Sequence, residues 1–213
     1  MRRHLAALSA AFLISAPYPA FGQALDLLLK AADQGDAKTV AVYLDKGLDP
    51  NTTDKQGNTL LMIASVQGHE ELAKLLVAHK ASLELRSPVG DSALMLASLK
   101  GHLGIVKLLV DHGAQLSPTS GWSPLQYAAF EGRSEVVRYL LDKGAAKNAL
   151  APHGYSALML AARGGHMEAA RMLLYEDAEV SVKAPSGDTV LSITRKRKDP
   201  EFEELLKRAG AVE

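Results

Sequence analysis

The glycines of this chain recur with a period of about 33 residues, and this period limits the possible folds more than any other feature. The glycines that open successive units lie 33, 31, 33 and 33 positions apart. Such a period is typical of proteins built from stacked repeats. Because glycine readily adopts left-handed backbone, three glycine sets in one register predict three fixed bends per unit. The sets are Gly57, Gly90, Gly121, Gly154 and Gly187; Gly35, Gly68, Gly101, Gly132 and Gly165; and Gly47, Gly113, Gly144 and Gly210.

Between these bends the apolar residues fall at helical spacing in two short segments of each unit, as in residues 61–64 and 72–76. This spacing predicts two short helices per unit. Neither helix can bury its apolar face within one unit. We therefore expect adjacent units to stack and to form a shared core.

The four inner units share one sequence pattern. They read GNTLLMIASVQGHEELAKLLVAHKA from Gly57, GDSALMLASLKGHLGIVKLLVDHGA from Gly90, GWSPLQYAAFEGRSEVVRYLLDKGA from Gly121 and GYSALMLAARGGHMEAARMLLYEDA from Gly154. This pattern resembles the ankyrin repeat, G-x-T-P-L-H-x-A-A-x-x-G-H-x-x-I-V-x-x-L-L-x-x-G-A. The resemblance covers essentially the whole chain after its first 22 residues.

The resemblance implies an all-α solenoid of about six helix-turn-helix repeats, four internal and two caps, joined by short β-hairpin-like loops. The first cap places polar Lys30 where inner units are apolar, and the last places Thr194, Arg195 and Lys196 where they are small. Polar caps make a stack soluble. We expect one domain over residues 23–213, with units at about 23–53, 54–86, 87–117, 118–150, 151–183 and 184–213.

The chain departs from the family pattern at the TPLH signature. Only Pro124 keeps the proline, and Met62, Met95, Gln126 and Met159 replace the histidine. We therefore expect the family's Thr–His hydrogen bond to be missing. A bond of this kind contributes roughly 0.5–1.5 kcal/mol to stability, and methionine packing is expected to recover part of it. The pair Asp199-Pro200 predicts a well-capped start of the last helix.

Residues 1–22 have the layout of a secretory signal peptide. Arg2 and Arg3 precede an apolar run over residues 5–16, and the small-x-small triplet 20–22 follows. The run is shorter than the roughly 20 residues of a membrane-spanning helix, so an uncleaved anchor is the weaker interpretation. We expect cleavage after Gly22, with Ala24 as an alternative, and a product in the periplasm, or secreted if the source has a single membrane. The chain has no cysteine, which leaves no disulfide or lipid-attachment site.

The charge balance and the motifs argue against several functions. The chain carries 24 Lys and Arg against 24 Asp and Glu, so it lacks the basic footprint of most nucleic-acid binders. No P-loop, nucleophile elbow or zinc-protease motif occurs in it, and we expect no enzyme activity and no cofactor. The basic run 195–198 is interpreted as a solvated face, with an anionic lipid or partner as the alternative.

A metal site is the remote alternative. In an exported protein, methionine and histidine residues repeated in register suggest a copper-binding site. However, histidine at these positions belongs to the ankyrin pattern, and methionine at helical spacing usually lies in the core. We therefore predict no metal site. The residues concerned are Met62, Met95, Met159, His69, His102 and His166.

The resemblance implies partner binding on the concave face, at the hairpin tips and the open side of each first helix. Trp122, Phe130 and Tyr155 occupy positions there that should face solvent, and such an apolar patch marks an interaction site. Residues 117–120 carry a two-residue deletion that predicts a shortened hairpin before Trp122. The other predicted partner-binding residues are apolar Leu99, Val89 and Val66, and polar Asp91, Lys100, Glu131, Arg163, Asn58, Gln67 and His153.

The sequence thus predicts an exported, monomeric, non-enzymatic module that binds another protein. Two roles stay open. One is inhibition, as by an immunity protein against a periplasmic toxin or hydrolase. The other is support of an exported enzyme, for instance one of stress defence.

Overall fold

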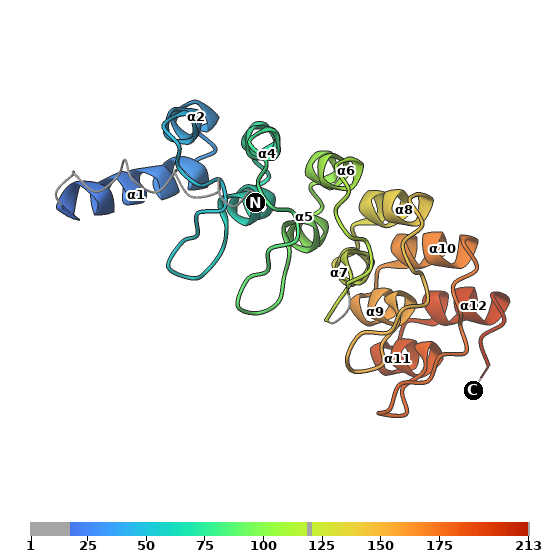
Figure 1. Ribbon diagram of the computed structural model, residues 1–213. Coiled ribbons are helices and arrows are strands. Elements are labelled where there is room, and N and C mark those ends of the chain that lie inside the picture. The colour runs from blue at the N-terminus through green and yellow to red at the C-terminus, as the bar shows by residue number, and fades with distance from the viewer. Residues whose placement is uncertain (1–17, 119–120, 213) are drawn as a thin grey trace, which may run out of the picture.

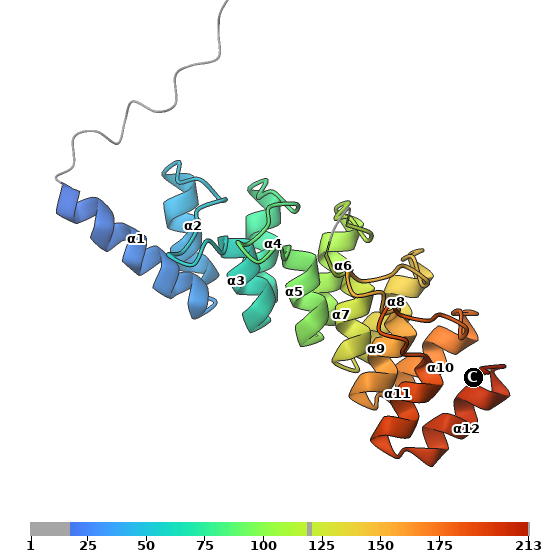
Figure 2. The same ribbon diagram turned by 90° about the horizontal axis from the view of Figure 1, so that it is seen from below.

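The computed structural model describes residues 18–118 and 121–212, which form two rows of antiparallel helices (Figures 1 and 2). Each first-row helix contacts the next helix of its row, as do the second-row helices from α2 to α10. The first row consists of α1 (Tyr18–Asp33), α3 (Leu60–Gln67), α5 (Ala93–Lys100), α7 (Pro124–Phe130), α9 (Ala157–Gly164) and α11 (Val190–Arg197). The second row consists of α2 (Ala37–Asp45), α4 (Glu70–Ala78), α6 (Leu103–Asp111), α8 (Ser134–Asp142), α10 (Met167–Tyr175) and α12 (Pro200–Arg208).

Long loops join one helix pair to the next and project from the first-row side (Figure 1). Single antiparallel bridges close two of them, Thr53 with Thr59 and Lys183 with Thr189, and the described residues contain no longer strand. The rows bend so that the loops lie on the inner side of the curve (Figure 1). The predicted all-α solenoid with hairpin-like loops is confirmed, and we call this inner side the concave face.

The predicted bends are present. All 14 glycines of the three sets have φ between +67° and +94°. Where a unit lacks the glycine of a set, another residue takes the same conformation. Lys80 and Asp177 do so after α4 and α10, and Lys198 does so after α11, with φ of 62°, 56° and 57°.

In α3 and α5 a methionine sulfur takes the acceptor place that histidine has in the family pattern, so methionine contributes a hydrogen bond there and not only packing. The Met62 sulfur accepts a hydrogen bond from the Thr59 backbone N–H at 3.4 Å, while the Thr59 hydroxyl accepts from the Met62 N–H at 3.2 Å. Ser92 and Met95 repeat this reciprocal arrangement at the start of α5. The thioether thus takes the acceptor role of the imidazole, in a capping box with an unusual acceptor.

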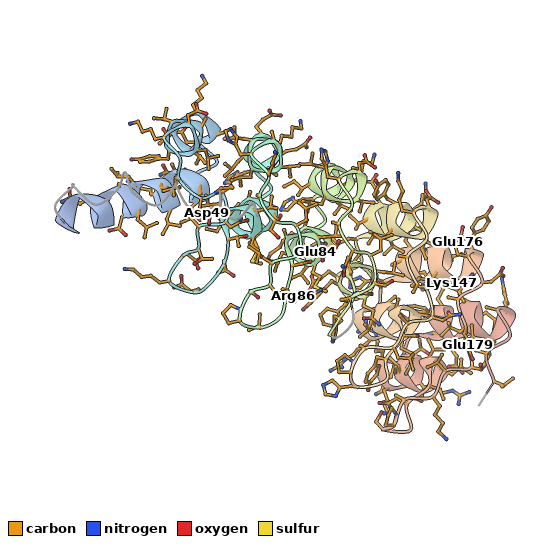
Figure 3. The ribbon with its side chains drawn as sticks, in the orientation of Figure 1. Asp49, Glu84, Arg86, Lys147, Glu176 and Glu179 are labelled. Carbon is orange, nitrogen blue, oxygen red and sulfur yellow. The ribbon has the colours of Figure 1, made fainter. Side chains whose placement is uncertain are left out.

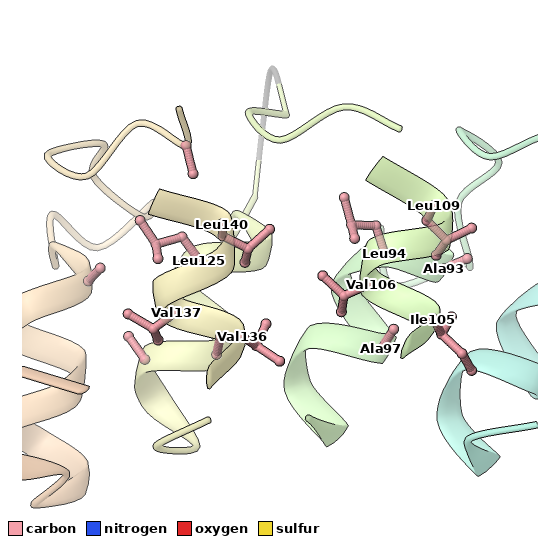
Figure 4. Close-up of a cluster of buried hydrophobic side chains, with 14 of the residues drawn as sticks. Ala93, Leu94, Ala97, Ile105, Val106, Leu109, Leu125, Val136, Val137 and Leu140 are labelled. Carbon is pink, nitrogen blue, oxygen red and sulfur yellow. The ribbon is translucent and has the colours of Figure 1, made fainter. Parts of the chain in front are cut away.

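The core runs along the stack rather than within any unit. Leu94 and Val106 of one helix pair face Val136 and Leu140 of the next (Figure 4), and all four are at most 1% exposed. The buried apolar cluster extends from Leu28 to Ala211. Stability therefore depends on contacts between neighbouring units, as expected for a solenoid.

Side chains near the ends of the helices fasten a unit to the preceding one: His69, His102 and Arg133 come just before second-row helices, and Arg197 ends α11. His102 Nε2 donates to the Val66 carbonyl at 3.1 Å, and Arg133 Nε donates to the Leu99 carbonyl at 3.1 Å. His69 and Arg197 make the same kind of bond, to the carbonyls of Asp33 and Arg163. Two histidines of the copper alternative, His69 and His102, thus hold seams between units, and the methionine sulfurs of α3 and α5 cap helices.

The two ends of the stack differ. At the first end Lys30 is exposed, as predicted for a cap, but Leu27 and Val42 are also 57% and 50% exposed. At the last end the Asp199 carboxylate caps α12 by accepting from the Phe202 N–H at 3.0 Å, with Pro200 in the first turn, as predicted.

The basic run 195–198 is largely engaged within the chain. Arg195 pairs with Glu203 at 2.9 Å, Lys196 with Asp188 at 2.5 Å, and Arg197 donates to the carbonyl of Arg163. These contacts give three of the four basic side chains a structural role in the last unit.

Most of the predicted signal peptide, residues 1–17, lies outside the described residues. Helix α1 begins at Tyr18, so cleavage after Gly22 would leave its portion from Gln23 to Asp33. None of the helices in residues 18–118 and 121–212 combines the length and apolar character needed to cross a bilayer.

Candidate protein-interaction surface

The concave face is built from the hairpin arms and the first-row helices. In each unit the residue after the opening glycine stands on the arm that leads into the first helix. This position is chemically varied, whereas the helix caps that follow it are alike. Along the stack the position is occupied by Asn58, Asp91, Trp122, Tyr155 and Asp188.

Three aromatic side chains gather in the fourth unit. The Trp122 ring lies 5.2 Å from the Tyr127 ring, in a tilted arrangement, and 5.4 Å from the Phe130 ring, edge to face. These distances are in the range that favours aromatic pairs. All three side chains are half-buried, less open than the sequence suggested. We call Trp122, Tyr127 and Phe130 the aromatic cluster.

A hydrogen bond across a seam holds the aromatic cluster in place. The Tyr127 hydroxyl donates to Asp91 Oδ1 of the preceding unit at 2.6 Å. Burial, followed by this bond to the carboxylate, raises the pKa of Tyr127 well above its ordinary value of 10.0. Asp91, predicted as a rim residue, thus positions an aromatic ring that sequence reasoning missed.

Tyr155 belongs to a separate site in the next seam. Its hydroxyl donates to Asp188 Oδ2 of the following unit at 2.6 Å, and the Arg163 guanidinium lies 5.8 Å from its ring centre. Asp188 also accepts from Lys196 and from the Ser186 hydroxyl. The bond to Lys196, then those to Tyr155 and Ser186, holds the pKa of Asp188 well below its ordinary value of 3.8. The single predicted patch is therefore two sites, one around Trp122 and Phe130 and one around Tyr155.

The sequence profile described as "Ankyrin repeats (3 copies)" matches residues 28–120 and 116–184. The chain belongs to the ankyrin-repeat family. Ankyrin repeats are protein–protein interaction modules that are generally not enzymes.

Two relatives and one solved structure are similar to parts or most of the chain. An ankyrin repeat protein of Rickettsia bellii is 32% identical over 119 residues, 52% of this chain and 34% of the relative. The ankyrin repeat-containing protein P1E11.10 of Schizosaccharomyces pombe is 36% identical over 56 residues, 26% of this chain and 27% of the relative. The chain thus matches about a third or less of their lengths. The human ASB11 ankyrin repeat domain superposes with a TM-score of 0.81 at 24% identity, over 87% of this chain and 84% of that one.

The other predicted site residues of this ankyrin stack differ in their exposure and in the contacts that they make within the chain. Val89 is 84% exposed at a hairpin tip, and Lys100, Arg163 and His153 are also exposed. Leu99 and Val66 are half-buried, and their carbonyls accept the seam bonds. The remaining polar ones make local contacts: Asn58 donates to Asp54, Gln67 donates to Asp33, and Glu131 lies 3.8 Å from Arg133.

The shortened hairpin predicted before Trp122 includes residues 119 and 120, which lie outside the described residues. Within residues 18–118 and 121–212, no group of three or more His, Cys, Asp or Glu side chains is placed to hold a metal ion.

Proposed function

We propose that this chain is a non-enzymatic interaction module that acts outside the cytoplasm and binds a partner protein on its concave face. The observation that carries the proposal is the aromatic cluster, whose rings lie half-open on that face. Tryptophan and tyrosine are the residues most enriched at binding hot spots. The signal-peptide pattern of residues 1–22 supports the location.

The contacts of the cluster favour tight binding. The edge-to-face contact of Phe130 and the hydroxyl bond of Tyr127 fix two of the rings before a partner arrives. A surface that is already ordered loses less entropy on binding. Exposed Val89 extends the apolar area toward a hairpin tip, and Lys100, Arg163 and His153 supply charged or polar contacts around it.

Affinity capture tests this proposal. The bait is the chain from Gln23 onward, and the source is an extracytoplasmic extract of the native host. We expect the double variant Trp122→Ala, Phe130→Ala to lose the partner, with affinity reduced about 30-fold or more, because hot-spot truncations typically cost about 2 kcal/mol. Circular dichroism is used to check that the double variant is folded.

Val42→Ala is the matched control, since it removes an exposed apolar side chain from the second-row helix α2, away from the concave face. A partner lost by the double variant and kept by this control supports concave binding. A partner kept equally by wild type and the double variant contradicts it. The identity of the partner then separates the two roles, because a toxin or hydrolase indicates an inhibitor and a stress-defence enzyme indicates a helper.

A further inference from the structure

A cavity opens on the side of the stack opposite the hairpins, between the second-row helices α8 and α10. Its volume is about 420 Å³, within the range of about 300–1,000 Å³ typical of ligand pockets. Leu141 of α8 is buried there and Met172 of α10 is half-buried, so the two provide an apolar lining. Methionine adapts its shape to different ligands, which suits a binding surface.

Tyr175 stands at the edge of this cavity and is 85% exposed. It is the last residue of α10. The last residues of α4, α6 and α8, which precede it along the row, are Ala78, Asp111 and Asp142. An exposed tyrosine is therefore peculiar to this one place in the row, and tyrosine is enriched in protein interfaces.

The charges around the cavity favour a cation. Asp142, Glu168 and Glu176 line it, and in the described part of the chain none of their carboxylates forms an ion pair within 4.0 Å. Nearby Lys147 donates to the backbone carbonyl of Glu176 rather than to its carboxylate (Figure 3). Helices α8 and α10 also both end at the cavity, and helix C-termini carry partial negative charge.

Two arginines also line the cavity, and they offset only part of this negative charge. Arg171 of α10 lies 3.9 Å from Glu201 of α12, so a carboxylate outside the cavity is already close to it. Arg138 of α8 is the other. Three carboxylates and two helix ends thus face two guanidinium groups, one of which has a partner.

We infer that this cavity is a second docking site, which takes an apolar side chain of a partner protein followed directly by an arginine or lysine. The apolar side chain fills the space over Leu141 and Met172. The cationic side chain lies against the Tyr175 ring and the carboxylates of Asp142 and Glu176. A cation held over an aromatic face is attracted by the ring quadrupole. The site is independent of the concave face, so the chain can bridge two proteins.

Capped dipeptides test the inference on the whole chain labelled with ¹⁵N. N-acetyl-Leu-Arg-amide is titrated against the protein, and N-acetyl-Leu-Glu-amide serves as the charge-reversed probe. We expect the arginine probe to shift the amide signals of α8 and α10, with weaker binding as salt is raised. The glutamate probe should bind at least about ten-fold more weakly, because it faces unpaired carboxylates.

Two variants separate the contribution of the Tyr175 ring from that of the carboxylates. Tyr175→Ala should weaken the arginine probe about two- to five-fold through loss of the cation–π contact. Because Tyr175 is 85% exposed, the substitution leaves the packing of the fold intact. The double variant Asp142→Asn, Glu176→Gln should bring the two probes to similar affinities. Val42→Ala, exposed on α2 at the other end of the stack, is the matched control and should change neither affinity.

The inference is overturned if the arginine probe leaves the signals of α8 and α10 unshifted at millimolar concentration. It is also overturned if both probes bind wild type equally, or if Tyr175→Ala binds as wild type does. None of these results bears on the concave face.

Discussion

Three residues other than glycine hold backbone conformations that glycine holds elsewhere in the stack. Lys80, Asp177 and Lys198 have positive φ, in register with the glycine sets. A side chain with a Cβ atom is strained in this region, at roughly 1–2 kcal/mol per residue. The positive φ at these three positions is therefore imposed by the packing of the units, and the backbone there is strained.

Lys80→Gly should stabilise the protein by about 1 kcal/mol. Lys80 is exposed, so the substitution removes strain without removing a packed side chain. Urea unfolding followed by circular dichroism measures the change. Lys107→Gly in the middle of α6 is the control and should lower stability by about 1 kcal/mol, because glycine disfavours helix interiors. A lower midpoint for Lys80→Gly would contradict the strain argument.

The sequence predicted the residue-level bends well and the residue-level bonds less well. The glycine register and the cap formed by Asp199 were both visible as patterns. The hydrogen bond to the Met62 sulfur was not, since a thioether is a weak acceptor that is ordinarily counted as apolar. Its acceptor role depends on how closely the Thr59 N–H approaches it, which only coordinates show.

At the scale of the elements, single polar groups connect hairpins to helices of other units. Asp188 is the clearest case, since its carboxylate accepts from Tyr155 on the arm leading into α9, from Lys196 of α11 and from Ser186 of its own hairpin. These bonds favour the ionised carboxylate. The last hairpin is thus anchored by this charge as well as by the buried Ala184.

Asp188→Asn should lower the urea midpoint at neutral pH, and its difference from wild type should shrink below about pH 4. The pKa of Asp188 in the folded chain is far below its ordinary value of 3.8. The stabilisation is therefore complete above that value and is lost progressively as the pH falls below it. Urea titrations at several pH values measure this.

Glu201→Gln is the control for this comparison, because its carboxylate is 80% exposed and 3.9 Å from its partner Arg171. Its difference from wild type should be small at every pH. A constant difference between Asp188→Asn and wild type down to pH 3 would mean that the carboxylate does not stabilise the fold through its charge.

Prediction at this scale succeeded for the helix pairs and missed the contacts that cross from one unit to the next. Helical spacing and glycine position are properties of one unit, and a single unit shows them in its sequence. The partner of Tyr127 is Asp91 in the preceding unit, and the cavity beside Tyr175 forms only where α8 and α10 meet. Such features depend on the distance between units, which the repeat pattern leaves undetermined.

The whole molecule is a linear array in which each unit contacts only its neighbours. The seam bonds show this regularity, because His69 and His102 each reach back to the unit before. In such an array stability is approximately a sum of unit and interface contributions. The length of the stack is then a variable that can be changed without changing the fold.

A second copy of residues 69–101 inserted after Gly101 should give a folded and more stable chain. Each junction again reads Gly-His, so every seam keeps its histidine and its glycine. We expect unchanged helical content per residue and a higher urea midpoint, because one interior interface is added. A copy of residues 72–101 is the control. It breaks the period and should lower the midpoint, and equal midpoints for the two insertions would contradict the seam argument.

The bond between Tyr127 and Asp91 makes the aromatic cluster part of the mechanics of the stack. This hydrogen bond crosses the seam between the third and fourth units. A change in the angle between these units would therefore lengthen the bond or move the Tyr127 ring. A partner that binds the Tyr127 ring would therefore also affect the angle between the third and fourth units. Conversely, bending the stack elsewhere would move the ring relative to Trp122. One hydroxyl group thus connects the aromatic cluster to the geometry of the seam.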